Sequence, residues 1–155
     1  SDLKCEVISK LSKNYKVLSE VGSKEEGILI SPAKWIRMMS NELQAGSFKV
    51  IAEARESGNV GIYRPNGSAH VQLIKRILAN VAQEDILWEA PKKPQQVWFL
   101  RQFGANVNLG NIGPNDLIPL ECLRLGLRGD TFFEHLPEAL ADGKRLSVEE
   151  VTEED

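Results

Sequence analysis

The chain has 155 residues, of which 42% are hydrophobic and 26% charged, and its formal net charge is -3. These values are ordinary for one folded domain with a core, and they argue against an intrinsically disordered chain. No apolar run is long enough to span a bilayer, and no basic stripe interleaved with aromatic residues indicates nucleic-acid binding. The start, SDLKCEV, lacks the basic and apolar regions of a signal peptide, so we expect a cytoplasmic location.

The charge is unevenly distributed along the chain. From Glu134 onward there are eight acidic residues against Lys144 and Arg145, which leaves 17 basic and 14 acidic residues in the remainder. Such an acidic run is typical of a solvated extension rather than of a packed domain. We therefore expect a folded part over residues 1–133 and an acidic C-terminal tail over residues 134–155.

The chain opens with a helical pattern over residues 1–14. Leu3, Val7 and Leu11 recur at the helical spacing and are expected to face the core. A short aliphatic run, YKVLSEVG, follows at residues 15–22 and is expected to be the first strand.

The second helix is predicted over residues 31–46 from the signals at its two ends. Ser31 is the expected N-cap, Pro32 occupies the first helical position, and Gly46 is the expected C-cap. The apolar residues of this segment predict one buried face: Trp35, Ile36, Met39 and Leu43.

The middle of the chain repeats the same unit. Residues 48–58 and 85–93 are short apolar runs of the kind that form strands, and residues 67–81 between them have helical periodicity. The expected buried stripe of that helix is Val71, Ile74, Leu78 and Val81.

The last unit contains two helices around a fourth strand. Pro94 and Gly104 bound the first of these helices, and residues 106–114 form the strand. Residues 114–129 follow as one helix that is capped by Asn115 or Asp116. Strands that alternate with helices predict an α/β fold with a parallel sheet, and the four strands correspond either to half of a (β/α)8 barrel or to an open sheet.

Three of the four predicted strands end in a glutamate, namely Glu20, Glu53 and Glu89. The carboxyl ends of parallel strands lie at one edge of the sheet, so we expect these carboxylates to lie close together and in register. The fourth strand contributes Asn108 and Asn111 to this edge instead of an acid. For any one glutamate, an ordinary solvated or ion-paired role stays open, because such residues are usually at the surface.

A cation would relieve the repulsion among these carboxylates. At about 5 Å and an effective dielectric constant near 20, each pair repels by roughly 3 kcal/mol. Magnesium takes oxygen ligands and commonly uses one or two carboxylates together with substrate oxygens. We therefore predict a Mg²⁺ site at this edge. His70 and His135 are isolated from other metal ligands, so zinc is not expected.

Basic residues follow the same strand ends. Lys24, Arg55, Lys92 and Lys93 form a set suited to a substrate with carboxylate and phosphate groups. The stretch PKKPQQ leads into a helix N-terminus, where backbone amides favour phosphate. Two plainer alternatives stay open: Lys24 as an ordinary loop lysine, and Arg55 as an ion-pair partner of Glu56.

Five stretches carry a family resemblance: VLSEVGSK, EARESG, EAPKKPQQ, NVNLGNI and LECLRLGLRGDTFF. Their order and spacing resemble the phosphosulfolactate synthase family, whose enzymes add sulfite to phosphoenolpyruvate on the way to coenzyme M and sulfolactate. The resemblance implies that residues 1–133 are the C-terminal half of a TIM-type (β/α)8 barrel, a four-stranded half-barrel that contains strands five to eight and their flanking helices.

The resemblance also implies roles for individual residues. Lys24 corresponds to the general acid that protonates the carbon bearing the phosphate, and Arg55 corresponds to a catalytic group that holds phosphate or sulfite. Glu20, Glu53 and Glu89 are the implied ligands of Mg²⁺, which would bind the substrate carboxylate. The remaining implied substrate-binding residues are Glu56, Ser57, Lys92, Asn108, Asn111 and Gly113.

Two functions from different classes follow. The first is a carbon–sulfur lyase that adds sulfite to phosphoenolpyruvate with Mg²⁺. The second is a non-catalytic family member or barrel fragment that acts through protein–protein contacts, of the type of the heat-stress-associated plant relatives. Half a barrel exposes layers that are normally core. Either function therefore predicts a partner, which is a homo-oligomer or a complementary N-terminal half-barrel chain, and neither predicts a nucleic acid or a membrane.

Overall fold

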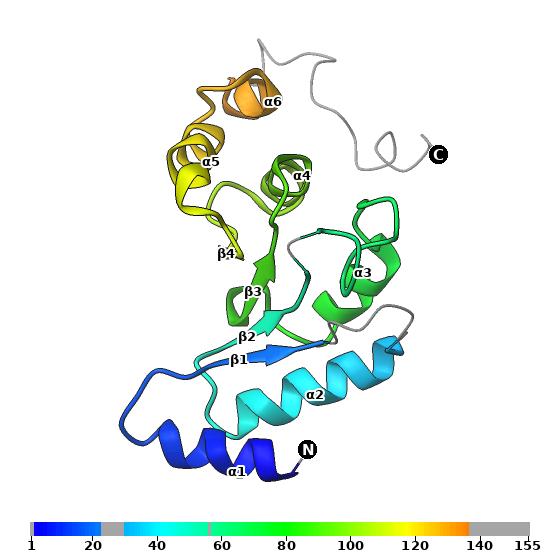
Figure 1. The fold of residues 1–155 in the computed structure, drawn as a ribbon, viewed down its shortest axis with the longest axis vertical. Coiled ribbons are helices and arrows are strands. Elements are labelled where there is room, and N and C mark those ends of the chain that lie inside the picture. The colour runs from blue at the N-terminus through cyan, green and yellow to red at the C-terminus, as the bar shows by residue number, and fades with distance from the viewer. Residues whose placement is uncertain (1, 23–29, 56, 137–155) are drawn as a thin grey trace.

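A four-stranded, entirely parallel sheet organises the chain. The computed structural model describes residues 2–22, 30–55 and 57–136. In Figure 1 the first three strands turn progressively relative to one another, so the sheet curves. Its strands lie in the order β1 (Leu18–Val21), β2 (Lys49–Ala52), β3 (Ile86–Glu89) and β4 (Leu109–Gly110). The fold is α/β, and a curved parallel sheet with flanking helices is consistent with part of a TIM-type barrel, as predicted.

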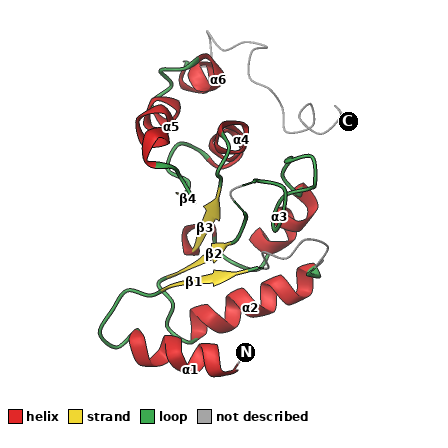
Figure 2. Ribbon diagram, viewed as in Figure 1, coloured by secondary structure: helices red, strands yellow, loops and turns green. Residues whose placement is uncertain are grey.

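Helices alternate with the strands along the chain, as Figure 2 shows. The α-helices are α1 (Asp2–Leu11), α2 (Pro32–Gln44), α3 (Val71–Leu78), α4 (Lys93–Phe103), α5 (Leu117–Arg124) and α6 (Gly129–Phe132). Short 3-10 helices occupy Gln83–Asp85, Pro114–Asp116 and Phe133–His135. Within the described residues, none of the helices has the length and apolarity that a bilayer crossing needs.

The strands are shorter than the apolar runs that predicted them. Each ladder spans four residues or fewer, because the chain leaves the sheet soon after the last apolar residue of each run. The segments that follow the strands are loops at the carboxyl edge. These loops carry most of the predicted site residues.

The predicted N-cap of α2 is confirmed, whereas its C-cap lies one residue earlier than predicted. Ser31 is the N-cap, and its hydroxyl oxygen accepts a hydrogen bond from the Lys34 amide at 3.3 Å. The C-cap is Ala45 rather than Gly46. Gly46 follows with a φ of 110°, and a Cβ there would lie 2.5 Å from the Ser12 hydroxyl oxygen, so this position requires glycine.

The predicted stripe of α3 is partly wrong. The buried residues of this helix are Leu73, Ile74 and Ile77, whereas Val71 and Leu78 are only partly buried. The helix begins four residues later than expected, because the preceding segment pairs with itself through an antiparallel bridge between Tyr63 and Ala69. Leu73 and Ile77, which the predicted stripe left out, belong to the core instead. Val81 is buried, but it lies beyond the end of the helix.

The predicted helix over residues 114–129 is also wrong, because it is divided. A 3-10 turn precedes α5, and the chain turns at Gly126, which has a φ of 69°, before α6 begins. The turn is closed by a hydrogen bond from the Leu127 amide to the Cys122 carbonyl at 2.9 Å. His135 lies against this turn, with Nε2 2.9 Å from the Arg124 carbonyl oxygen. The tail boundary near residue 133 stays a prediction.

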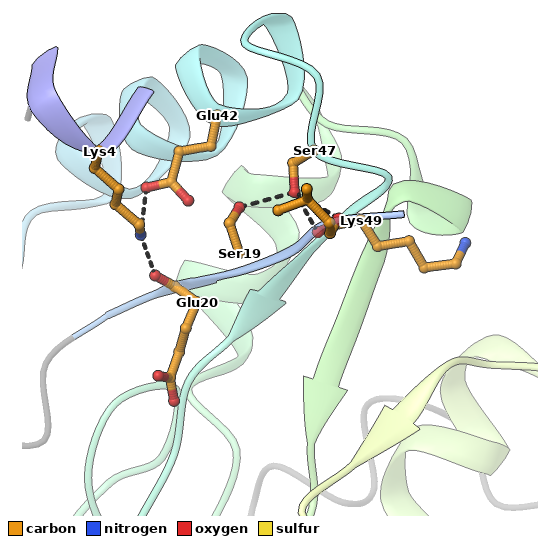
Figure 3. A network of polar contacts seen from close by, with 7 residues as sticks. Lys4, Ser19, Glu20, Glu42, Ser47 and Lys49 are labelled. Atoms are coloured by element: carbon orange, nitrogen blue, oxygen red, sulfur yellow. Dashed lines mark hydrogen bonds and ion pairs between the residues drawn. The ribbon is translucent and has the colours of Figure 1, made fainter. Parts of the chain in front are cut away.

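The first helix faces the opposite way to the prediction. Leu3, Val7 and Leu11 do share a stripe, but they are 70%, 48% and 43% exposed, and Ile8 is the buried residue of α1. α1 packs on α2, where the Lys4 ammonium is 2.7 Å from the buried Glu42 carboxylate (Figure 3). The apolar stripe of α1 is therefore left on the surface.

The core lies between the sheet and the helices. Alternate strand residues are buried, as expected for side chains that point to opposite faces. On the helix side, Val50, Ala52, Ile86 and Trp88 are all completely buried. On the other side of the sheet, Leu18 is 49% exposed.

Candidate active site

The strand register places two of the three glutamates side by side. Ala52 pairs with Trp88, so the next residues, Glu53 and Glu89, leave neighbouring strands at the same level. Glu20 instead pairs with Ile51, two residues before Glu53. The expectation that all three lie in one register is therefore wrong for Glu20. β1 ends at Val21, and the Glu53 amide donates to the Val21 carbonyl at 3.0 Å.

Ala54 joins three strand ends at this edge. Its amide donates to Glu89 Oε2 at 2.6 Å, and its carbonyl accepts from Asn111 Nδ2 at 3.2 Å. Asn111 is a non-glycine residue in the left-handed region, with a φ of 55°, a conformation that asparagine tolerates better than most residues. The segment that carries Glu53 and Arg55 is thus tied to the ends of β3 and β4, 35 and 57 positions away in the sequence.

Glu53 is held in a crowded position. It is 7% exposed, and a Cβ at Gly22 would lie 2.7 Å from Glu53 Cβ and 3.2 Å from Glu53 Oε2. Only glycine, here with a φ of 146°, lets the end of β1 pass this close to the carboxylate side chain.

Two buried residues that the sequence did not single out hold the loop after β2 in place. The Tyr63 hydroxyl donates to the Glu89 carbonyl at 2.6 Å. The amide nitrogen of the Gln95 side chain donates to the carbonyls of Gly58 at 2.7 Å and Gly67 at 3.0 Å, and its oxygen accepts from the Lys92 amide at 3.1 Å. The paired glutamines after PKKP were the available signal, since polar residues at a buried helix start usually make such bonds.

Tyr63→Phe tests the first of these contacts. Burial raises the pKa of the Tyr63 hydroxyl, and the Glu89 charge raises it further, so the group stays a neutral donor at ordinary pH. The variant leaves the Glu89 carbonyl without this donor, and we expect it to lower the free energy of unfolding by roughly 1–3 kcal/mol in urea titrations. Tyr15→Phe, at a residue 69% exposed, is the matched control and is expected to change little. Equal effects of the two variants would contradict the structural role of Tyr63.

Of the predicted basic residues that the structure describes, Arg55 and Lys92 lie in loops after the strands, whereas Lys93 forms an ion pair on α6. Arg55 is half-buried beside Ala54, and Lys92 is exposed at the N-cap of α4. Lys93 is engaged elsewhere, because its ammonium is 2.8 Å from Asp130 on α6. The hydrogen bond from Lys93, with lesser help from other nearby groups, holds the pKa of Asp130 below its usual range.

Two further predicted residues, Ser57 and Gly113, lie in loops that follow the strands. Ser57 is exposed, and its hydroxyl bonds the Asn59 side chain at 2.6 Å within the loop after β2. Gly113 precedes the 3-10 turn before α5, and its carbonyl accepts from the Asp116 amide at 2.9 Å. Lys24 and Glu56 lie outside the described residues.

Asn108 is not at the carboxyl edge, contrary to the prediction. It precedes β4, and its side-chain amide donates to the carbonyls of Ile86 at 3.1 Å and Glu84 at 3.3 Å, at the start of β3. The Asn108 backbone lies two residues before Gly110, the partner of Glu89, and its side chain points back toward the amino ends of the strands, away from the site.

The part of the chain that the structure describes contains no group of three or more His, Cys, Asp or Glu side chains arranged to hold a metal ion. This agrees with the register, in which Glu53 and Glu89 directly follow the paired residues Ala52 and Trp88, whereas Glu20 pairs with Ile51. Two adjacent carboxylates are nevertheless within the number that magnesium commonly takes from a protein.

A comparison with protein families decides the relationship. Residues 1–130 match the family model described as (2R)-phospho-3-sulfolactate synthase (ComA). The chain belongs to the phosphosulfolactate synthase family. The match covers every helix and strand from α1 to α5, and so includes the whole sheet and the loops that follow its strands.

Curated phosphosulfolactate synthases from three organisms are similar to the chain. The one from Methanothermobacter thermautotrophicus is 42% identical over 132 residues, which are 83% of this chain and 51% of the relative. The Bacillus subtilis enzyme is 42% identical over 133 residues, covering 84% and 53%, and the Methanocaldococcus jannaschii enzyme is 40% identical over 121 residues, covering 76% and 48%. The chain therefore spans about half the length of these relatives.

Proposed function

We propose that this chain supplies half of an active site that adds sulfite to phosphoenolpyruvate, with Mg²⁺, to form phosphosulfolactate. The observation that carries the proposal is the junction at Ala54, which brings the segment with Glu53 and Arg55 to Glu89 at one edge of the sheet. The whole sheet lies within the part of the chain that matches the phosphosulfolactate synthase family. A carboxylate pair together with an arginine in the same short segment suits a metal ion and an anionic substrate at one place.

The described side chains support a division of roles. Glu53 and Glu89 would hold Mg²⁺, although Glu89 Oε2 already accepts a bond from the Ala54 amide. Bound there, the ion would stabilise negative charge that develops on the substrate carboxylate. Arg55, together with Lys92 at the N-cap of α4, would hold phosphate or sulfite. Lys24 remains our candidate for the general acid, and Glu20 for an outer ligand of the ion.

The proposal includes a second unit that completes the site. The chain matches only about half of each relative, and one face of its sheet carries no covering helix among the described residues and leaves Leu18 49% exposed. A complementary half-barrel or another copy of the chain would close this face and bring further side chains to the same edge.

Phosphorus NMR tests the reaction directly. The chain is incubated with phosphoenolpyruvate, sulfite and Mg²⁺, first alone and then with the part of the Methanothermobacter thermautotrophicus relative that lies outside the match. We expect a phosphosulfolactate resonance in the completed protein, and a rate lowered by at least about 10²-fold in Glu53→Gln, the scale on which one electrostatic stabiliser is lost. Glu84→Gln, an exposed glutamate at the other end of the sheet, is the matched control.

A non-catalytic role through protein contacts is the second candidate. The open face and the half-length match favour it. It predicts no product in any combination, and no shift of the Glu53 and Glu89 carboxylate signals when Mg²⁺ is added. A Mg²⁺-dependent shift that Glu53→Gln abolishes would count against this role, because a scaffold needs no ion there.

A further inference from the structure

Lys4 on α1 contacts two other elements at once, as Figure 3 shows. Its ammonium donates to Glu42 Oε1 on α2 at 2.7 Å and to the backbone carbonyl of Glu20 on β1 at 2.5 Å. The Glu20 side chain points away from the ammonium in the same view. The contact with β1 is therefore a contact with its backbone, close to the carboxyl edge of the sheet.

The Glu20 carbonyl lies on the free edge of β1. The carbonyl of the next residue, Val21, accepts from the Glu53 amide at 3.0 Å, so it points toward β2. Backbone groups alternate in direction along a strand, so the Glu20 carbonyl points the other way, where no strand pairs with β1 in the described sheet. The Lys4 ammonium thus supplies the donor that this carbonyl does not receive from the sheet.

The partner of Lys4 on α2 is a buried carboxylate. Glu42 is 4% exposed and follows Trp35 and Met39 on the buried face of the helix, at a spacing where an apolar residue is usual. Its Oε2 has no hydrogen-bond partner among the described residues. A buried carboxylate with an unsatisfied oxygen destabilises a fold. Glu42 is therefore better explained by the ammonium that it holds than by the packing of α2.

The end of β1 that Lys4 holds also confines Glu53. Gly22 approaches the Glu53 side chain so closely that a Cβ at Gly22 would lie 2.7 Å from Glu53 Cβ. The same Cβ would lie 3.0 Å from Cη2 of Trp35 on α2. The placement of β1 against α2 thus limits where the Glu53 side chain can lie.

We propose that Lys4 and Glu42 are positioning residues for Glu53, and that they act through the carboxyl end of β1. The inference deepens the proposed function, because it rests on Glu53 as a ligand of Mg²⁺. Residues that hold a metal ligand in place change the metal affinity by about 10- to 100-fold when they are replaced. Lys4 and Glu42 come from two helices outside the sheet, so the helical layer takes part in shaping the ion site.

Nuclear magnetic resonance of the full chain tests the proposal without substrates. The hydrogen-exchange rate of the Glu53 amide reports its bond to the end of β1, and titration of the Glu53 carboxylate signal with Mg²⁺ reports the affinity for the ion. In Lys4→Met we expect exchange to become about 10-fold faster, the scale of one lost hydrogen bond to a charged group. We expect the Mg²⁺ affinity to fall by about 10-fold.

Three further variants sharpen the test. Lys4→Arg keeps a cation that can donate to both oxygens, so it is expected to preserve both values. Glu42→Gln removes the charge that holds the ammonium and keeps the shape of the side chain. It is expected to change both values in the direction of Lys4→Met, and it carries the test if Lys4→Met fails to fold. Lys10→Met, exposed in the last turn of α1, is the matched control and is expected to change neither value.

A merely structural role of the pair predicts a different result. Lys4→Met would then lower the free energy of unfolding, while the folded protein kept the Mg²⁺ affinity and the Glu53 exchange rate of Lys10→Met. This result would overturn the proposal. If the unchanged chain showed no response to Mg²⁺, the proposed metal site would fail, and the Glu53 exchange rate alone would decide whether Lys4 and Glu42 position this residue. The two failures are therefore distinguishable.

Discussion

Replacement of Trp88 by alanine is expected to lower the free energy of unfolding by about 3–5 kcal/mol. Trp88 is completely buried on β3, and its ring stacks on Phe99 and Phe103 with centroid distances of 5.3 Å and 6.3 Å. The loss combines the transfer free energy of the ring with the cavity that remains. It is a large share of the roughly 5–15 kcal/mol that stabilises a typical domain. Urea denaturation followed by far-UV circular dichroism measures it.

Trp88→Phe is the matched control for this experiment. Phenylalanine keeps most of the ring stacking, and it removes an indole N–H that is buried without a hydrogen-bond partner among the described residues. We expect it to cost less than about 1.5 kcal/mol. If the alanine variant lost no more stability than the phenylalanine variant, ring packing would not be what holds β3 against α4.

Gly61→Ala is expected to destabilise the protein by about 2–5 kcal/mol and to displace the backbone of Glu53. A Cβ at Gly61 would lie 2.0 Å from the Glu53 carbonyl oxygen, and Gly61 has a φ of 78°. The expected loss combines left-handed backbone strain of roughly 1–2 kcal/mol with overpacking of roughly 1–3 kcal/mol. Because the atom in the way belongs to the backbone, no side-chain rotation relieves the contact.

Gly67→Ala separates these two causes. Gly67 lies in the same loop with a φ of 86°, but a Cβ there would have its nearest neighbour at an ordinary 3.5 Å. This variant is therefore expected to carry the backbone strain alone. Amide chemical shifts of Glu53 and Ala54 should move in Gly61→Ala and stay in place in Gly67→Ala. Equal shifts and equal losses would show that the close approach to Glu53 does not matter.

Local signals predicted parts of this fold well. Ser31 followed by Pro32 correctly identified the start of α2, and Gly104 correctly identified the end of α4. Local periodicity was less reliable where a stripe did not face the core. Leu3, Val7 and Leu11 recur at helical spacing yet lie on the surface, because periodicity reports that a helix has an apolar face and not what covers that face.

In the candidate site, too, local signals predicted some features and missed others. Glutamates at strand ends correctly indicated the edge at which Glu53 and Glu89 meet, because all carboxyl ends of a parallel sheet lie together. That Glu20 pairs with Ile51, two residues before Glu53, was not predictable from the end of its apolar run. The register depends on pairing between strands, which the run itself does not report. Tyr63 and Gln95 were missed for a related reason. Their bonds reach residues 26 to 37 positions away, and although the paired glutamines hinted at buried polar bonds, no local pattern identifies such distant partners.

The sequence by itself therefore determined the order of helices and strands, the parallel sheet and the edge that carries the carboxylates. These features follow from periodicity, caps and chain direction, which are local properties. Only the tertiary structure decided which glutamates share a level, that the Asn108 side chain points toward the amino ends of the strands, and that Ala54 joins the ends of β2, β3 and β4. These features depend on hydrogen bonds between segments far apart in the chain, which form only when the sheet and its loops have packed.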